Sequence, residues 1–164
     1  MNLYILRHGI AVEPGTAGCE RDSERPLTPE GAHKLARIAA AMKAMGLSFD
    51  LILSSPYVRA RQTAEIVARS FRATKMMAFS EALAVGGSAR ALIEEIRRHE
   101  PELREALLVG HEPGLSRLIS VLTGGQAVTL KKGGLGRLCI AEIRYGRCAS
   151  LEWLLSPKQM VLMT

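Results

Sequence analysis

Two histidines of this chain follow short apolar runs, at positions where a buried strand would end. His8 comes after Arg7 and the run at residues 3–6, and His111 comes after the run at residues 106–109. A histidine can act as a nucleophile and carry a group covalently. An arginine beside it indicates an anionic partner, because a guanidinium offers a fork of donors to paired oxygens. We therefore interpret the two histidines as reactive groups and not as core side chains.

A third apolar run leads to a further cation. Residues 51–53 are followed by Ser55 and Pro56, which we expect to cap a helix and to lie in its first turn, together with Arg59. If the three runs form parallel strands, their carboxyl ends meet at one edge of the sheet, where ligands bind in open α/β folds. The cluster predicted at that edge consists of Arg7, His8, Arg59 and His111.

The predicted cluster suits a tetrahedral dianion such as a phosphoryl group. Arg7 and Arg59 supply forked donors, and helix N-termini add unpaired N–H groups. Gly9 and Gly110 carry no side chain, so we expect a ligand to approach the main chain there. One histidine would attack phosphorus while the other cationic or polar groups neutralise the equatorial oxygens. Cationic neighbours would keep the attacking imidazole uncharged at neutral pH.

The remaining segments supply the elements that position these residues. A fourth strand is expected at residues 138–143 and a fifth at 151–155, paired through a turn at Tyr145 and Gly146. The polar segment 15–26 is expected to be a loop. Between the strands, apolar residues recur every three to four positions, which is typical of helices. These helical patterns lie at residues 35–45, 60–71, 92–96 and 115–122.

Helix boundary signals agree with this division of the chain. Thr28 and Pro29 predict the start of the first helix, and Gly46 its end, while Gly124 and Gly125 end the last one. Strand followed by helix, repeated, predicts an α/β fold: a three-layer αβα sandwich with a mainly parallel central sheet. A length of 164 residues fits a single domain, residues 1–164.

Composition narrows the class of protein. The net charge is +6, but the basic residues are scattered and the aromatic share is only 4%, which argues against a nucleic-acid surface. No apolar stretch is long enough to span a bilayer, and Arg7 and His8 interrupt any signal-peptide pattern. Cys19, Cys139 and Cys148 lack metal-ligand spacing and indicate reduced thiols. We expect a cytoplasmic protein that binds neither nucleic acid nor membrane.

Three alternatives stay open at this level. His8 and His111 with a carboxylate could hold zinc or iron, although the neighbouring arginines would repel that cation. Cys19 and Arg25 have the Cys-x5-Arg spacing of cysteine phosphatases, although the carboxylates between them would repel a phosphate. A binding module without turnover would use the same cations, but it would not need a nucleophile. We favour an enzyme with no metal and no cofactor.

Several segments match a known family in order and spacing. They read LRHG at 6–9, SSPYVRARQTAE at 54–65 and VGHEP at 109–113. These resemble the histidine phosphatase superfamily, also called phosphoglycerate-mutase-like. The segments RPLTPEG at 25–31 and WLLSPKQM at 153–160 resemble the small SixA-type phosphohistidine phosphatases. The resemblance implies the phosphoglycerate-mutase-like fold in its small form, without a large helical cap insertion.

The resemblance also implies roles for individual residues. His8 would be the phosphoryl-accepting nucleophile. The phosphate would be bound by Arg7, Gly9, Arg25, Arg59 and His111. In many members a glutamate protonates the leaving oxygen, and Glu81 stands in the corresponding part of this chain, with Asp22 and Glu13 as rivals.

Two departures from the larger members bear on the substrate. The stretch 10–14 reads IAVEP and lacks the serine or threonine and the asparagine that contact phosphate there, and the chain has little room for a lid. A shallow, open pocket suits a phosphate presented on a protein surface. We predict a protein phosphohistidine, as in a histidine phosphotransfer domain of a phosphorelay, with a small phosphomonoester as the alternative. A histidine leaving group, with a pKa of about 6.5, needs less help from an acid than an alkoxide does.

Overall fold

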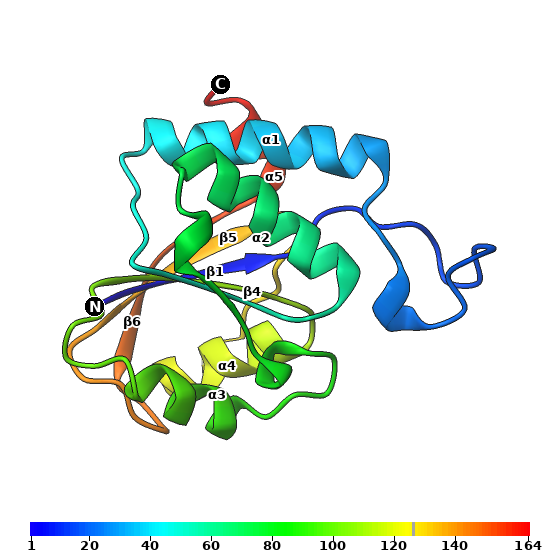
Figure 1. Ribbon diagram of the computed structural model, residues 1–164. Helices are drawn as coiled ribbons and strands as arrows, with labels where there is room; N and C mark the ends of the chain where they lie inside the picture. Colours follow the sequence, from blue (N-terminus) through cyan, green and yellow to red (C-terminus); the bar gives the residue numbers. More distant parts are fainter. Residues whose placement is uncertain (126) are drawn as a thin grey trace.

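A central sheet with strand order β3-β2-β4-β1-β5-β6 runs through this computed structural model, which describes residues 1–125 and 127–164 (Figure 1). Its strands are β1 (Asn2–Arg7), β2 (Leu51–Ser54), β3 (Met77–Phe79), β4 (Glu105–Gly110), β5 (Leu135–Ile140) and β6 (Ala149–Leu155). The pairs β2/β3, β2/β4 and β1/β4 are parallel, whereas β1/β5 and β5/β6 are antiparallel. The mainly parallel sheet is therefore confirmed, with an antiparallel hairpin added at one side.

Helices cover both faces of the sheet, which confirms the three-layer sandwich (Figure 1). On one face lie α1 (Pro29–Ala44), α2 (Val58–Phe71) and α5 (Pro157–Val161). On the other lie α3 (Ala89–Arg97) and α4 (Gly114–Thr123). Because both faces of β1, β2 and β4 are buried, these strands are almost continuously apolar, and this is why the sequence identified them.

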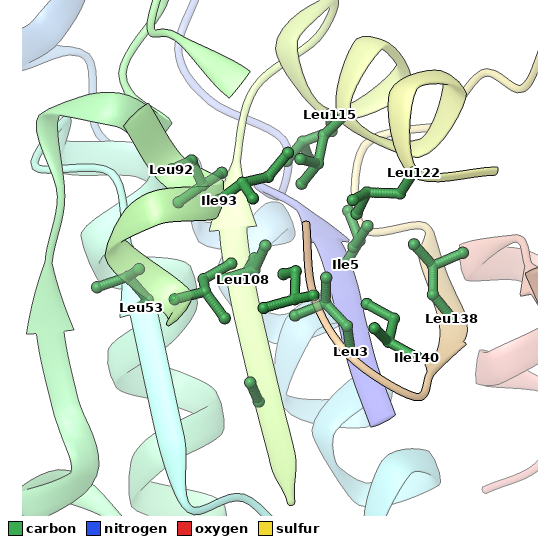
Figure 2. Close-up of a cluster of buried hydrophobic side chains, with 14 of the residues drawn as sticks. Leu3, Ile5, Leu53, Leu92, Ile93, Leu108, Leu115, Leu122, Leu138 and Ile140 are labelled. Atoms are coloured by element: carbon green, nitrogen blue, oxygen red, sulfur yellow. The ribbon is translucent and has the colours of Figure 1, made fainter. Parts of the chain in front are cut away.

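The two core layers follow from the alternation of side chains along a strand. Leu3 and Ile5 of β1 face the layer of α3 and α4, where Figure 2 shows them in one cluster with Leu108 of β4 and Leu115 of α4. Tyr4 belongs to the opposite layer, with the side chains of α1 and α2. The sheet is thereby held rigidly from both sides, and its strand ends become fixed points for functional residues.

The carboxyl ends of β1, β2 and β4 meet at one edge of the sheet. Ile5 of β1 and Leu53 of β2 both pair with Leu108 of β4, so the three strands are in step. Arg7 pairs with Gly110 at the last position of β1 and β4. The shared edge that the apolar runs predicted is therefore present.

Two elements have boundaries that differ from the prediction. Ser55 does not cap α2, which begins at Val58 with Tyr57 as its N-cap residue and without a side-chain cap. The fourth predicted strand begins three residues earlier than expected, at Leu135, and ends at Ile140. Gly136 hid this start, because it interrupts the apolar pattern. Ile143 lies in a loop and not in the strand, and it is apolar because its side chain is buried in the core.

Two short elements were not predicted. Strand β3 has three residues, too few for a pattern, and α5 has five. The start of α5 did carry a signal, because Ser156 and Gln159 form a capping box. Single-turn 3₁₀ helices lie at Asp22–Glu24, Thr74–Met76 and Glu81–Leu83.

The predicted loop at residues 15–26 is irregular apart from the turn Asp22–Glu24. It belongs to an arm that projects beyond the sheet edge in Figure 1. Among the described residues, no helix has both the length and the apolar character needed to cross a bilayer.

Candidate active site

The predicted cluster at the sheet edge forms in the structure. The ring centroids of His8 and His111 lie 5.0 Å apart, and Nε of Arg59 donates to Nε2 of His8 at 3.3 Å. All three side chains are buried, with exposed fractions of 3–5%. Burying histidine and arginine together is costly unless their polar atoms have partners or await a ligand. The contacts of each side chain therefore show what the site can do.

The main chain fixes the tautomer of His8. Its Nδ1 lies 2.7 Å from the carbonyl oxygen of Gly9. A carbonyl only accepts hydrogen bonds, so Nδ1 carries the hydrogen and Nε2 keeps its lone pair. Arg59 donates to that lone pair, which is consistent with this tautomer. His8 thus presents a nucleophilic nitrogen beside a guanidinium.

Both histidines are uncharged at neutral pH. The pKa of His8 is lowered to about 4, chiefly by burial and also by the charges of Arg59, Arg7 and Lys132, while the hydrogen bond with Gly9 acts in the opposite direction. Burial also lowers the pKa of His111 to about 3, with His8 and Arg59 as the next causes. The sequence predicted a lowered pKa for the attacking histidine because of its cationic neighbours. The largest cause of the lowering is burial, which only the fold reveals.

Arg7 is held at the pocket by a segment from far along the chain. Its NH1 donates to the carbonyl of Leu130 at 2.8 Å, and the carboxylate of Glu112 accepts from the N–H of Leu130 at 2.8 Å. Glu112 also accepts from the N–H of Ser116 in the first turn of α4. Nε of Arg7 is buried and has no partner among the described residues. Arg7 therefore retains a donor for an anion.

The guanidinium of Arg59 is bound by the projecting arm. Its NH1 donates to the carbonyl of Asp22 at 2.6 Å, and its NH2 to the Asp22 carboxylate at 3.0 Å. Arg25 pairs with the same carboxylate at 2.7 Å and also donates to the carbonyl of Val12. Burial alone would raise the pKa of Asp22, but hydrogen bonds from Arg25 and Arg59 outweigh it and lower that pKa. Asp22 is thus an ionised carboxylate lying where an anion would bind.

The three candidate acids are placed differently. Asp22 is in the site, but its lowered pKa makes it a poor proton donor. Glu81 is exposed at the start of the turn Glu81–Leu83. The two residues that follow it, Ala82 and Leu83, line a small cavity together with His111. The Glu81 carboxylate makes no hydrogen bond with His8, Arg59 or His111. Glu13 is exposed on the arm.

Gly9 has a different role from the one expected. A Cβ there would lie 2.5 Å from Cδ1 of Leu35, so any larger residue would force this buried leucine of α1 to move. The N–H of Gly9 donates to Oγ1 of Thr63 at 3.1 Å, and so it is not free for a ligand. Gly9 supports His8 instead, through its carbonyl.

Two buried hydroxyl groups belong to the site and were missed. Thr63 accepts from Gly9 and donates to the carbonyl of Arg59 at 2.7 Å, which ties the end of β1 to helix α2. Oγ of Ser55 lies 2.8 Å from Nε2 of His111. Thr63 follows Arg59 by one helical turn, and this spacing was the available signal. Ser55 carried no signal beyond its place after a strand, which equally fits a helix cap.

The site combines an uncharged nucleophile, a second uncharged histidine and two guanidiniums at one edge of the sheet. Such a set can bind a tetrahedral anion and accept a group at Nε2 of His8. Within the described residues, no group of three or more histidine, cysteine or carboxylate side chains is arranged to hold a metal ion.

Comparison with known proteins agrees with this geometry. Residues 3–84 match the model of the histidine phosphatase superfamily (branch 1). The chain belongs to the histidine phosphatase superfamily. An uncharacterized protein of Picosynechococcus sp. is 38% identical over 168 residues, which cover 98% of this chain and 99% of that relative. The resemblance inferred from the motifs is thereby confirmed.

Among the histidine phosphatases, the small SixA type shares the architecture. Phosphohistidine phosphatase SixA of Escherichia coli is 36% identical over 67 residues, 41% of this chain and 39% of that protein. The structure of the protein histidine phosphatase SixA complexed with tungstate superposes with a TM-score of 0.85 at 24% identity, over 96% of this chain and 98% of that one. The fold of this histidine phosphatase is therefore that of SixA.

Proposed function

We propose that this histidine phosphatase is a metal-independent phosphohydrolase that works through a phosphohistidine at His8. The observation that carries the proposal is the fixed tautomer of His8: an uncharged imidazole whose Nε2 lone pair lies beside the Arg59 guanidinium. A nucleophile that is deprotonated at neutral pH needs no separate base. The family match supports phosphatase activity in general.

The reaction proceeds in two transfers. Nε2 of His8 attacks phosphorus, and the bond from phosphorus to the leaving atom breaks with its electron pair going to that atom. The hydrogen stays on Nδ1, which keeps donating to the Gly9 carbonyl, and this hydrogen bond stabilises the positive charge on the phosphorylated ring. Water then attacks phosphorus, the P–Nε2 bond breaks, and inorganic phosphate leaves. Arg7, Arg59 and His111 bind the equatorial oxygens in both steps.

The substrate we propose is a phosphohistidine on a protein. The candidate acids favour it, because Asp22 is ionised and Glu81 is exposed and unattached to the site. An imidazole leaving group has a pKa of about 6.5 and departs without a strong acid, whereas an alkoxide does not. A phosphorylated partner such as a histidine phosphotransfer domain would present the group to His8 at the sheet edge. The free cysteines support a reducing, cytoplasmic setting.

The test is phosphate release from a phosphohistidine-bearing carrier protein and from p-nitrophenyl phosphate, each with and without EDTA. We expect the wild type to act on the carrier protein, to keep its activity in EDTA, and to lose it in His8→Ala. His99→Ala is the matched control, since His99 is exposed and lies outside the site. Its activity should equal that of the wild type.

Each other outcome points to a different function. Loss of activity in EDTA would indicate a metal site and overturn the mechanism. A strong preference for the aryl phosphate would favour a small phosphomonoester as substrate. Tungstate binding without turnover of either substrate would indicate a binding module.

A further inference from the structure

Ser55 is a buried serine whose hydroxyl contacts the second histidine. Its exposed fraction is 0%, and its Oγ lies 2.8 Å from Nε2 of His111. Oγ also accepts the N–H of Tyr57 at 3.2 Å. These are the hydrogen bonds of the Ser55 side chain among the described residues. The direction of the bond to His111 decides which nitrogen of that ring carries its hydrogen.

The contacts of Ser55 favour one direction. With one lone pair of Oγ taken by the Tyr57 N–H, the hydroxyl hydrogen needs an acceptor, and Nε2 of His111 is the acceptor within reach. The reverse direction would leave that buried hydroxyl hydrogen without a partner both before and after an anion binds, at a cost of about 1–3 kcal/mol, whereas in the favoured direction the unpaired donor is the Nδ1 hydrogen of His111, which an anion can satisfy. The hydroxyl therefore donates to Nε2, and the ring hydrogen lies on Nδ1.

The other ring nitrogen of His111, Nδ1, is available to a ligand. Nδ1 is buried and has no partner among the described residues, although His111 is only 4% exposed. The ring of His111 lies 5.0 Å from that of His8, and so it is a neighbour of any phosphoryl group carried on His8. A buried N–H with no partner is costly in the free protein and is satisfied when an anion arrives.

We propose that Ser55 is a positioning residue, which holds His111 in the tautomer with its hydrogen on Nδ1, so that this N–H donates to an oxygen of the transferring phosphoryl group. The proposal rests on the proposed phosphatase function for the identity of the ligand. In the opposite tautomer, Nδ1 would present a lone pair to a phosphate oxygen, and the two would repel each other. His111 is uncharged, so only the choice of tautomer makes it a donor.

The first readout is the tautomer itself, which needs no turnover. In ¹⁵N NMR spectra of the wild type at neutral pH, the Nδ1 signal of His111 should be that of a protonated nitrogen and Nε2 that of a bare one. Ser55→Ala should lose this preference. A wild-type spectrum with the hydrogen on Nε2 would overturn the proposal even if the protein is an active phosphatase.

The second readout is the coupling between Ser55 and His111. Ser55→Ala should weaken tungstate binding and lower kcat/KM by about tenfold or more, a loss of the size found when a metal-binding histidine loses its outer hydrogen-bond partner. Asparagine at position 111 places an amide N–H near the former Nδ1 and has no tautomers. In a His111→Asn background, Ser55→Ala should therefore cost less than about twofold. An unchanged cost in that background would show a merely structural role and overturn the proposal.

Ser54→Ala is the matched control. Ser54 is the neighbouring serine, it is equally buried, and its hydroxyl donates to the Ser55 carbonyl without reaching His111. It should leave both the tautomer and tungstate binding unchanged, and equal losses in Ser54→Ala and Ser55→Ala would count against the proposal. If the wild type binds tungstate but hydrolyses neither substrate, the proposed function fails, while the tautomer and the tungstate arm still decide the role of Ser55.

Discussion

The ends of β1 and β4 hold their histidines in different ways. His8, at the end of β1, donates from Nδ1 to the carbonyl of the next residue, Gly9. His111, at the end of β4, contacts a hydroxyl that lies 56 positions away in the chain. A carbonyl can only accept, so the state of His8 is fixed by local main chain. A hydroxyl can donate or accept, so the state of His111 depends on what else that hydroxyl contacts.

The difference matches the two tasks. The nucleophile must offer a lone pair at Nε2 in every molecule, and a main-chain acceptor guarantees it. The second histidine must donate to an anion, and a partner from another strand sets this only once the sheet has formed. A local hydrogen bond thus fixes the attacking nitrogen of His8, while a long-range contact fixes the donor of His111. Three experiments can break or sharpen this contrast.

The largest effect we expect is a loss of stability in acid, shared by both histidines. Each is uncharged in the folded protein and has a pKa of about 6.5 when unfolded, so stability from their burial is complete above about pH 6.5. It is lost as pH falls from there toward about 4 for His8 and about 3 for His111. Urea unfolding should show a combined loss of about 4 kcal/mol between pH 7 and about pH 5.

Variants assign that loss to each strand end. His8→Asn should remove about half of this acid loss. His99→Asn, which alters an exposed histidine, should lose as much unfolding free energy between pH 7 and about pH 5 as the wild type does. If His8→Asn still loses about 4 kcal/mol of unfolding free energy in acid, His8 is not buried in its uncharged form. The account of how the end of β1 holds its histidine would then be wrong.

The next effect concerns Thr63, which supports the β1 side. Thr63→Val keeps the shape but leaves the Gly9 N–H without its acceptor, so thermal or urea unfolding should show a loss of about 2 kcal/mol. Turnover should fall because His8 is less well oriented. The His8 tautomer should not change, since the Gly9 carbonyl still only accepts. A changed His8 tautomer in the ¹⁵N spectrum would show that its fixation is not local.

The smallest effect concerns Asp22, which acts on the His8 side through Arg59. Asp22→Asn should release the Arg59 fork and tighten tungstate binding, by at most about fivefold, because a half-exposed ion pair contributes about 1 kcal/mol or less. Glu24→Gln on the same turn is the control, since Glu24 pairs only with Arg21, at 3.7 Å, among the described residues. Weaker tungstate binding in Asp22→Asn would mean that Asp22 holds Arg59 in place for the ligand.

Much of the architecture was predictable from local patterns. The apolar runs marked β1, β2 and β4, because strands buried on both faces cannot alternate in polarity. Thr28 accepts from the N–H of Gly31 as a helix cap, as its place before Pro29 predicted. Strand β3 was not predictable at three residues, and Gly136 concealed the start of β5 because it packs against Leu154 of β6.

The sequence by itself determined the chemistry at the sheet edge. Arg7, His8, Arg59 and His111 each stand directly at a strand end or in the first turn after one, and parallel strands in step must bring them together. The tautomer of His8 is also local, since its partner is the next residue.

Only the tertiary structure decided how those groups are held. The low pKa values arise mainly from burial, which depends on every element packed around the site. Ser55 on His111 and Asp22 on Arg59 are contacts between segments 56 and 37 positions apart. The sequence does not indicate the partner of a hydroxyl or a carboxylate. Such a group forms hydrogen bonds with whichever donors or acceptors the fold places about 3 Å from it.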